Sequence, residues 1–335
     1  MSRTRRRWLS VAIVLHDTAQ PLLARRLPDV SLLHAAEAHY ALSDAMGTVC
    51  FNARDNRLEG AADWLARLHL NYEIVGNWRL HEQDVRSGVL IVEHPKRLSE
   101  KTIAAVVESV RRGGTLLLTG MGVRSGGKRL RKLCGVVRVQ SPSQAEQLRI
   151  QCNGQQFATE HHLFRLTLSG AEPVMTAIDQ QGGEWPLLTG RSVGRGTAYY
   201  FATPLLTNHG RNEIPGPVVR AVFDQIVPAS RRLISTDAPE TVEVTLREQG
   251  RGGIVHLVNM AEGKRRIFRG GRRKYTLITD LPLTPECTVR VRFGRRPRSV
   301  VLQPQGTLLS DCDDHDGFLA APVPSFRGHQ MIVIE

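Results

Sequence analysis

The sequence has no long apolar run, few aromatic residues and no paired cysteines. The longest apolar run near its start, Val11–Leu15, is far too short to span a bilayer, and His16 and Asp17 end it before a signal-peptide core can form. Aromatic residues make up 5% of the chain, which argues against an aromatic-lined sugar cleft. The five cysteines are scattered without CxxC spacing, which excludes a zinc-ribbon site and favours reduced thiols. We therefore expect a cytoplasmic chain with no membrane contact, no cofactor and no metal.

Acidic residues are also in short supply, because 45 basic residues face 32 acidic ones and the net charge is +13. Such an excess is typical of proteins with polyanionic partners, although a source proteome rich in arginine is an alternative explanation. No nucleic-acid-binding motif accompanies the arginines, so we do not expect nucleic acid as a partner. The densest basic segment is predicted to be a loop that either binds phosphate, sulfate or uronate groups of an acidic polysaccharide or is merely solvated. Its cations are Lys264, Arg265, Arg266, Arg269, Arg272, Arg273 and Lys274.

Alternating strand and helix patterns in the first two thirds of the chain predict an α/β domain over residues 1–229. Ser99 is a good N-cap for a helix over Glu100–Arg112, Gly113 and Gly114 end it, and the apolar run Thr115–Thr119 follows at once. A helix placed between two apolar strands at this spacing indicates a βαβ crossover and a parallel sheet. Before it we expect a first strand over Leu9–Asp17, an irregular stretch, a helix over Leu58–Leu70, and strands over Tyr72–Val75 and Gly88–Glu93.

Shorter strands and a final helix complete this domain, and a second domain follows over residues 230–335. The turn Gly194–Gly196 predicts a hairpin. The expected elements are strands over His162–Leu166, Pro173–Ile178, Pro186–Ser192 and Thr197–Ala202 and a helix over Pro215–Ile226. Strand candidates then recur at a spacing of roughly ten residues, which is typical of a small all-β sandwich. They are Thr241–Leu246, Gly253–Asn259, Thr288–Phe293, Ser299–Gln303, Gly317–Ala321 and Gln330–Ile334.

The order of several motifs resembles the C-terminal half of β-galactosidases of glycoside hydrolase family forty-two and of some fucosidase-like proteins. These motifs are LSVAIVLHD, NYEIV, VRSGVLIVEHPKRLSEKTIAAVVESVRRGGTLLLTGMG, GRGTAYYF, IVHLVN and GHQMIVIE. The resemblance implies a trimerisation domain that is similar to class I glutamine amidotransferases, followed by a β-sandwich. Such a domain has a flavodoxin-like parallel sheet with helices on both faces, and it holds subunits together.

In the family that this chain resembles, the hydrolytic carboxylates lie in a (β/α)₈ barrel that precedes these domains. No barrel precedes Leu9 in this sequence. The chain is therefore expected to be either a free-standing accessory protein or the C-terminal part of a longer or split polypeptide.

The resemblance to amidotransferases can be tested on one turn. An active enzyme of that class needs a cysteine at the sharp turn from strand to helix, where helix-start amides form an oxyanion hole. The matching turn here, Thr119–Gly122, presents Met121, whose thioether has no proton to lose. Cys134 lies well past the turn and is predicted to be a buried residue at a helix end. We therefore predict no catalytic residue.

Polar residues nevertheless follow several predicted strands at their carboxyl ends, where open α/β sheets bind ligands. They form either a small repurposed pocket or loops that flank a subunit interface. The candidates are His16, Asp17, Glu93, His94, Gly120, Met121 and Gly122.

Two other groups of polar residues have the residue types of metal ligands but not the required spacing. Adjacent strand residues point to opposite faces, so His161 and His162 are not expected to share a metal. The spacing within Asp311–Gly317 fails the calcium-loop pattern, so we predict an acidic hairpin turn.

The sequence thus predicts a non-catalytic assembly module related to bacterial glycosidases. It would act through self-association into a homo-oligomer or by docking to a barrel-bearing chain. One alternative is the C-terminal portion of an active glycosidase, which needs two carboxylates roughly 5 to 9 Å apart. The other is a polyanion-binding protein.

Overall fold

The computed structural model describes residues 25–26, 28–34, 57–80, 87–95, 97–141, 144–206, 213–249, 251–270, 273–293, 296–310, 312–315 and 317–335. The chain divides into two compact units. The α/β unit comprises Pro28–Trp64 and Tyr72–Arg231, and the sandwich unit comprises Met1–Leu27, Leu65–Asn71 and Arg232–Glu335.

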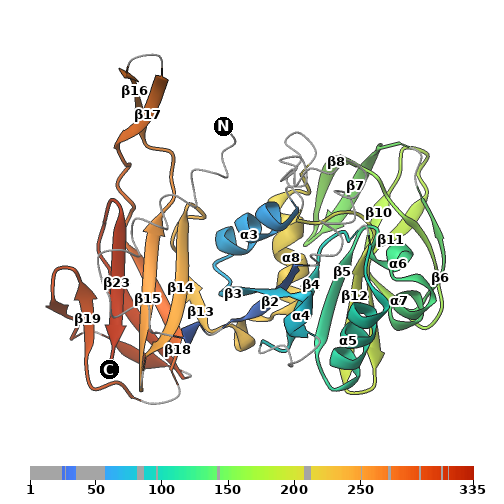
Figure 1. Cartoon of the computed structure of the whole chain (residues 1–335), viewed down its shortest axis with the longest axis horizontal. Helices are drawn as coiled ribbons and strands as arrows, with labels where there is room; N and C mark the ends of the chain where they lie inside the picture. The colour runs from blue at the N-terminus through green and yellow to red at the C-terminus, as the bar shows by residue number, and fades with distance from the viewer. Residues whose placement is uncertain are drawn as a thin grey trace. The chain divides into compact units, whose positions relative to one another are not determined.

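A nine-stranded mixed sheet forms the centre of the α/β unit (Figure 1). Its first five strands are parallel: β3 (Tyr72–Gly76), β2 (Val30–His34), β4 (Val89–Val92), β5 (Thr115–Thr119) and β12 (Gly196–Phe201). The remaining four are antiparallel: β11 (Glu184–Val193), β10 (Glu172–Ile178), β7 (Glu146–Cys152) and β8 (Gln155–His161). The prediction of a parallel sheet is therefore right for one half of the sheet and wrong for the other. The predicted strand Leu9–Asp17 lies outside the described residues.

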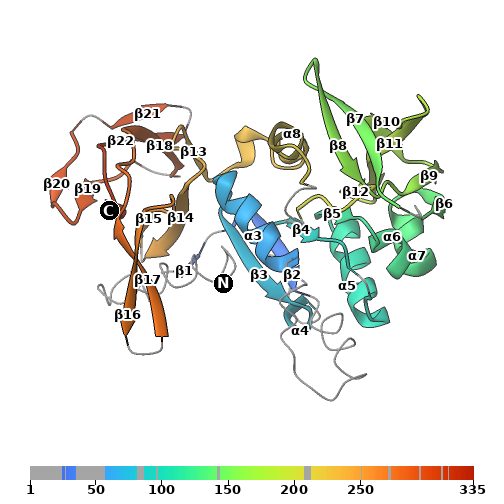
Figure 2. The same cartoon turned by 90° about the horizontal axis from the view of Figure 1, so that it is seen from above.

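The helices of this unit lie on both sides of the parallel strands (Figure 2). One side carries α8 (Gly216–Ile226) and α3 (Arg57–Arg67), of which residues 65–67 belong to the sandwich unit. The two helices meet where Trp64 lies beside Gly216. The other carries α5 (Glu100–Arg111), α6 (Gly122–Ser125) and α7 (Gly127–Leu133). The short helix α4 (Asn77–Leu80) follows β3, and the 3₁₀ helix η2 (Ala229–Arg231) follows α8. This double cover explains why the strands between the helices are apolar on both faces.

The sequence predicts α5 to within one residue, since the helix begins at Glu100 as expected and ends at Arg111, with Arg112 as its C-cap. Oγ of Ser99 accepts a hydrogen bond of 3.2 Å from the backbone N–H of Thr102, which is a side-chain N-cap. Ile103, Val106 and Val110 are buried on one face. The helix ends before Gly113, whose φ of 118° an L-residue rarely adopts.

Two hairpins of the α/β unit differ in how well the sequence predicted them. The hairpin between β11 and β12 is confirmed, with Val193 paired to Gly196. The hairpin between β7 and β8 was not predicted, although Asn153 and Gly154 have positive φ values of 50° and 75°, as such tight turns require. A separate two-stranded sheet joins β6 (Val136–Gln140) to β9 (Arg165–Leu168), so the strand predicted to start at His162 begins later.

The sandwich unit contains a six-stranded and a four-stranded antiparallel sheet. The larger sheet has the order β1 (Arg25–Arg26), β14 (Val242–Gln249), β15 (Gly252–Asn259), β23 (His329–Ile334), β19 (Val300–Gln303) and β20 (Thr307–Leu308). The smaller has the order β13 (Ile234–Thr236), β18 (Cys287–Arg292), β22 (Phe318–Val323) and β21 (Asp313–His315). The predicted turn within Asp311–Gly317 is confirmed as the hairpin between β21 and β22.

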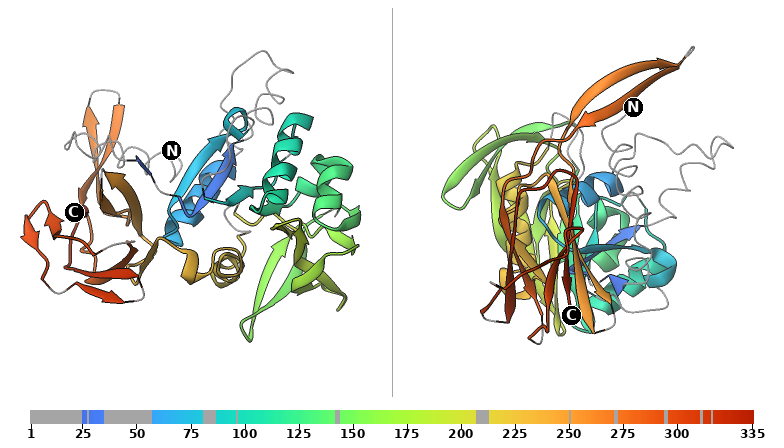
Figure 3. Two further views of the ribbon diagram at one scale, coloured as in Figure 1. Left: turned by 90° about the horizontal axis from the view of Figure 1, so that it is seen from below. Right: turned by 90° about the vertical axis from the view of Figure 1, so that its left-hand side faces the viewer.

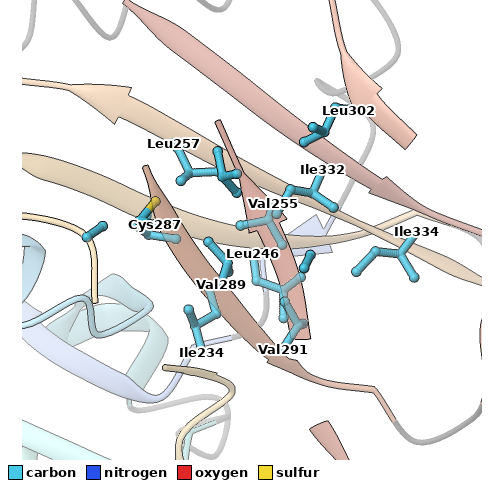
Figure 4. Close-up of a cluster of buried hydrophobic side chains, with 14 of the residues drawn as sticks. Ile234, Leu246, Val255, Leu257, Cys287, Val289, Val291, Leu302, Ile332 and Ile334 are labelled. Carbon is cyan, nitrogen blue, oxygen red and sulfur yellow. The ribbon is translucent and has the colours of Figure 1, made fainter. Parts of the chain in front are cut away.

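Alternating side chains of the two sheets form the sandwich core (Figure 4). Val255 and Leu257 of β15 belong to the same buried cluster as Val289 and Val291 of β18. Within the described ranges, no helix has the length and hydropathy that crossing a bilayer requires.

Candidate functional site

The carboxyl ends of β4 and β5 meet at one edge of the α/β sheet, which we call the β4–β5 edge. The strands are parallel neighbours with Val92 opposite Leu118, so the residues that follow each strand come side by side. Of the predicted strand-edge residues, Glu93, His94, Gly120, Met121 and Gly122 lie here, while His16 and Asp17 fall outside the described residues.

Glu93 holds the chain segment that follows β12. Its Oε1 accepts hydrogen bonds of 3.0 Å from the backbone N–H groups of both Leu205 and Leu206. Its Oε2 accepts a bond of 2.8 Å from the hydroxyl of Thr119. The side chain is buried, with 8% of the residue exposed. A carboxylate engaged in this way stabilises the fold and has little capacity left for a substrate.

His94 and Gly120 fit together closely. The backbone N–H of His94 donates to the hydroxyl oxygen of Thr119 at 2.8 Å, and its ring Nδ1 accepts from the N–H of Met121 at 3.2 Å. A Cβ placed on Gly120 would lie 1.9 Å from that Nδ1. Gly120 also has a φ of 52°, so both space and backbone conformation require glycine at this position.

The turn at this edge offers neither a nucleophile nor open amide donors at its first two residues. Gly120, the residue with positive φ, has no side chain, and Met121 has a right-handed backbone and a thioether. The N–H of Gly120 donates to the carbonyls of Phe201 and Thr203, and that of Met121 donates to His94. These amides are therefore unavailable to stabilise an oxyanion.

Buried thiols do not replace the missing nucleophile. Cys134 is 1% exposed at the C-cap of α7, as predicted for a buried helix-end residue. Burial raises the pKa of its thiol to about 12. Burial likewise raises the pKa of Cys287 to about 11 and raises the pKa of Cys152. Because the thiolate is the reactive form, these cysteines are poor nucleophiles at neutral pH.

The predicted basic loop is a hairpin of two regular strands, β16 (Lys264–Gly270) and β17 (Arg273–Asp280), so the loop assignment is wrong. The strands contain Ile267, Leu277 and Ile278 beside their cations, and β-branched residues such as isoleucine favour strands. These three apolar residues are exposed by 67%, 54% and 48%. The hairpin is a separate two-stranded sheet that extends beyond the rest of the sandwich unit (Figure 3). Lys264, Arg265 and Arg266 are exposed on it, Arg269, Arg273 and Lys274 belong to its strands, and Arg272 lies outside the described residues.

A polar cluster that the sequence does not predict joins residues of β7, β9 and β11 with Asp179, which follows β10. Nη2 of Arg165 donates to Glu146 at 2.9 Å and to Asp179 at 3.1 Å. The indole N–H of Trp185 donates to Asp179 at 2.8 Å, and this bond is the largest cause of the lowered pKa of Asp179. Since one guanidinium nitrogen binds both carboxylates, they act as an ion-pair network and not as an acid and base in a cleft.

The described histidines are not gathered in the way that the ligands of a metal site would be. His161, the last residue of β8, is buried, and His162, which follows the strand, is exposed, so their side chains lie in different environments. In the sandwich unit, Nδ1 of His256 lies 3.2 Å from Nε2 of His329, and the two rings are stacked. Burial lowers the pKa of His256 to about 4 and also lowers that of His329. Among the described residues, no group of three or more His, Cys, Asp or Glu side chains could hold a metal ion.

Comparison with solved structures places this fold among parts of glycosidases. The chain is similar to alpha-L-fucosidase isoenzyme 2 from Paenibacillus thiaminolyticus, with a TM-score of 0.70 and 19% identity over 97% of this chain and 51% of that chain. It is also similar to the beta-galactosidase from Bacillus circulans sp. alkalophilus, with a TM-score of 0.62 and 17% identity over 94% of this chain and 42% of that chain.

A third similar structure is Gan42B, a GH42 beta-galactosidase from G. stearothermophilus. Its TM-score is 0.63 at 16% identity, over 92% of this chain and 40% of that chain. No protein-family model and no curated protein matches the sequence. The chain therefore has the fold of one part of these glycosidases, and it spans between 40% and 51% of their length.

Proposed function

We propose that this chain is a non-catalytic assembly module related to bacterial glycoside hydrolases. The observation that carries the proposal is the unequal coverage of the fold match. At least 92% of this chain matches each of the three glycosidases, but at most 51% of each glycosidase is matched. The sequence resemblance assigns the catalytic carboxylates of the family to a barrel, which these two units do not resemble. The module serves carbohydrate metabolism by holding copies of itself together or by docking to a barrel-bearing chain.

The chemistry of the β4–β5 edge supports the non-catalytic part of the proposal. Glu93 is occupied by two backbone amides and a hydroxyl, and the turn presents Gly120 and Met121 where an amidotransferase needs cysteine. The other carboxylates drawn together in the α/β unit, Glu146 and Asp179, share one arginine. None of these groups is poised for acid–base or nucleophilic catalysis.

An exposed apolar site on the α/β unit supports self-association. β3 is an edge strand of the nine-stranded sheet, and it exposes Ile74. Trp78 follows it in α4 and is 55% exposed, with its ring folded over Gly76. Tryptophan is among the residues that contribute most to protein interfaces, so we place the contact between copies at β3 and α4.

Turnover of nitrophenyl glycosides tests the absence of catalysis. The purified chain is incubated with nitrophenyl β-galactoside and nitrophenyl α-fucoside, and the release of nitrophenol is followed. We expect a rate equal to that of buffer alone. Steady release that scales with protein concentration and persists through a second purification step would replace the proposal with an active glycosidase.

Polyanion binding is a second candidate function, favoured by the exposed cations of the β16–β17 hairpin. Neutralising Arg265, Arg266, Arg272 and Arg273 to glutamine tests it by retention on heparin. The matched control neutralises four exposed arginines of the α/β unit, Arg111, Arg129, Arg138 and Arg149. Polyanion binding by the hairpin predicts a large loss of retention for the first variant only. Equal losses would mean that net charge alone causes retention.

A further inference from the structure

The short helix α7 carries a cluster of cations that the proposed assembly role does not use. α7 carries Lys128, Arg129, Arg131 and Lys132 within seven residues. Arg129 points to α5, where it forms an ion pair of 3.2 Å with Glu100. The other three are spaced at i, i+3 and i+4 and therefore share one face of the helix. That face lines a surface pocket of about 420 Å³.

Arg191 of β11 completes the basic lining and is held in place. Its guanidinium donates a hydrogen bond to the backbone carbonyl of Lys132 at the end of α7. Its stem lies over Gly135, where an added Cβ would come within 3.0 Å of Cδ. Gly135 leaves room for the arginine because it has no side chain, and its φ of 63° also favours glycine. Because this bond uses one of five N–H donors, the group keeps donors for a ligand.

The pocket gathers positive charge without compensation in the described part of the chain. None of its lining residues there is acidic: they are Lys128, Arg131, Lys132, Gly135, Val136, Val137, Ser169 and Arg191. The helix dipole gives a local reason for Arg131 and Lys132 in the last turn of α7. It disfavours Lys128 in the first turn, and it does not explain Arg191. Like charges on one helix face destabilise the helix unless an anion neutralises them.

We infer that this pocket binds a small organic molecule that carries a phosphate or sulfate group. Arginine and lysine in combination are the side chains that recognise such oxyanions, with Arg191 as the fixed fork and the lysines as mobile charges. The volume of 420 Å³ lies in the range of pockets for organic ligands and exceeds what one inorganic oxyanion needs. Val137, which is 58% exposed, and the hydroxyl of Ser169 are available to contact the body of the ligand.

Isothermal titration calorimetry on the full chain at low salt tests the inference with three probes. Glucose 6-phosphate represents the ligand class, and inorganic phosphate and glucose represent its two halves. We expect glucose 6-phosphate to bind more tightly than phosphate and glucose not to bind. Replacing both lysines, Lys128→Gln and Lys132→Gln, is expected to weaken binding of glucose 6-phosphate by about tenfold or more.

The matched control is Arg129→Gln, which removes a charge from the same helix outside the pocket. We expect it to change the affinity by less than about twofold. No binding of glucose 6-phosphate, or equal weakening by the control, would overturn the site. If inorganic phosphate binds as tightly as glucose 6-phosphate, the inference that the ligand is an organic molecule is wrong. The mass of the assembly in solution is measured on the same variants and should not change, so the outcome is separate from that of the assembly role.

Discussion

The imidazole ring of His94 occupies the space that a side chain on Gly120 would need. An added Cβ would lie 1.9 Å from Nδ1, and φ of Gly120 is 52°. We therefore expect Gly120→Ala to destabilise the protein by about 3 kcal/mol, combining backbone strain with a steric clash. Urea unfolding of the full chain measures this change.

Gly127→Ala is the matched control for that substitution. Gly127 has a similar φ of 58°, but no atom lies within 4 Å of an added Cβ. The Gly127→Ala variant should lose only about 1 kcal/mol of its free energy of unfolding, from backbone strain alone. Combining Gly120→Ala with His94→Ala should recover part of the larger loss. Equal losses for the two glycines would show that His94 does not constrain the turn.

Glu93 is expected to stabilise the fold and not to take part in chemistry. Glu93→Gln keeps the size of the side chain but replaces one acceptor oxygen with an NH₂ group facing backbone N–H or hydroxyl donors. We expect a loss of roughly 1–3 kcal/mol in the free energy of unfolding. Glu108→Gln on the exposed side of α5 serves as control and should change stability by less than about 0.5 kcal/mol. A negligible effect at Glu93 would contradict its assigned role.

Acid should weaken the sandwich unit through its stacked histidines. Burial lowers the pKa of His256 from 6.5 to about 4 and also lowers the pKa of His329. Between these pH values the unfolded chain binds more protons than the folded one, so stability falls as the pH drops from 6.5 towards 4 and is full above 6.5. The contribution of His256 is on the order of 1–3 kcal/mol.

Thermal unfolding across that pH range measures the effect. His256→Gln should flatten the dependence, while His162→Gln, at an exposed position of the α/β unit, should leave it as it is. An unchanged pH dependence in the His256 variant would show that other groups cause it.

Trp78 is expected to be central to the contact between copies. Trp78→Glu places a charge at an exposed apolar position and should lower the mass measured by light scattering towards that of one chain. Val174→Glu, at another exposed apolar position of the same unit, should leave the assembly intact. Dissociation by both variants, or by the control alone, would place the interface elsewhere.

Local rules predicted those elements whose signals are strong and short-range. The cap at Ser99 and the buried face of Ile103, Val106 and Val110 define α5, and the apolar run Thr115–Thr119 is β5 with the same bounds. Val30–His34 lies in a stretch that is predicted to be irregular, but it forms β2 between β3 and β4 in the parallel half of the sheet. The strand has only five residues, and its three apolar residues, Val30, Leu32 and Leu33, are too few to establish a period, so pairing with β3 and β4 identifies it.

Other features depend on contacts between distant residues or on signals that were overlooked. The turn Asn153–Gly154 between alternating runs is a hairpin signal present in the sequence, whereas the bonds from Glu93 to Leu205 and Leu206 span more than 110 residues. The sequence predicts a loop for the basic hairpin because its cations are dense and its apolar residues show no regular alternation, since Leu277 and Ile278 are neighbours. The pocket cations of α7 lie close together in the sequence, but Arg191 joins them only in the folded unit.

Light scattering coupled to size-exclusion chromatography tests the assembly role most directly. The mass of the full chain is measured from low micromolar to about 100 µM concentration, a range in which stable interfaces are occupied. We predict a mass of two or more chains of 37.3 kDa each, reduced by Trp78→Glu. A mass of one chain at every concentration, unchanged by that substitution, would contradict self-association and leave docking to a barrel-bearing chain as the only form of the assembly role.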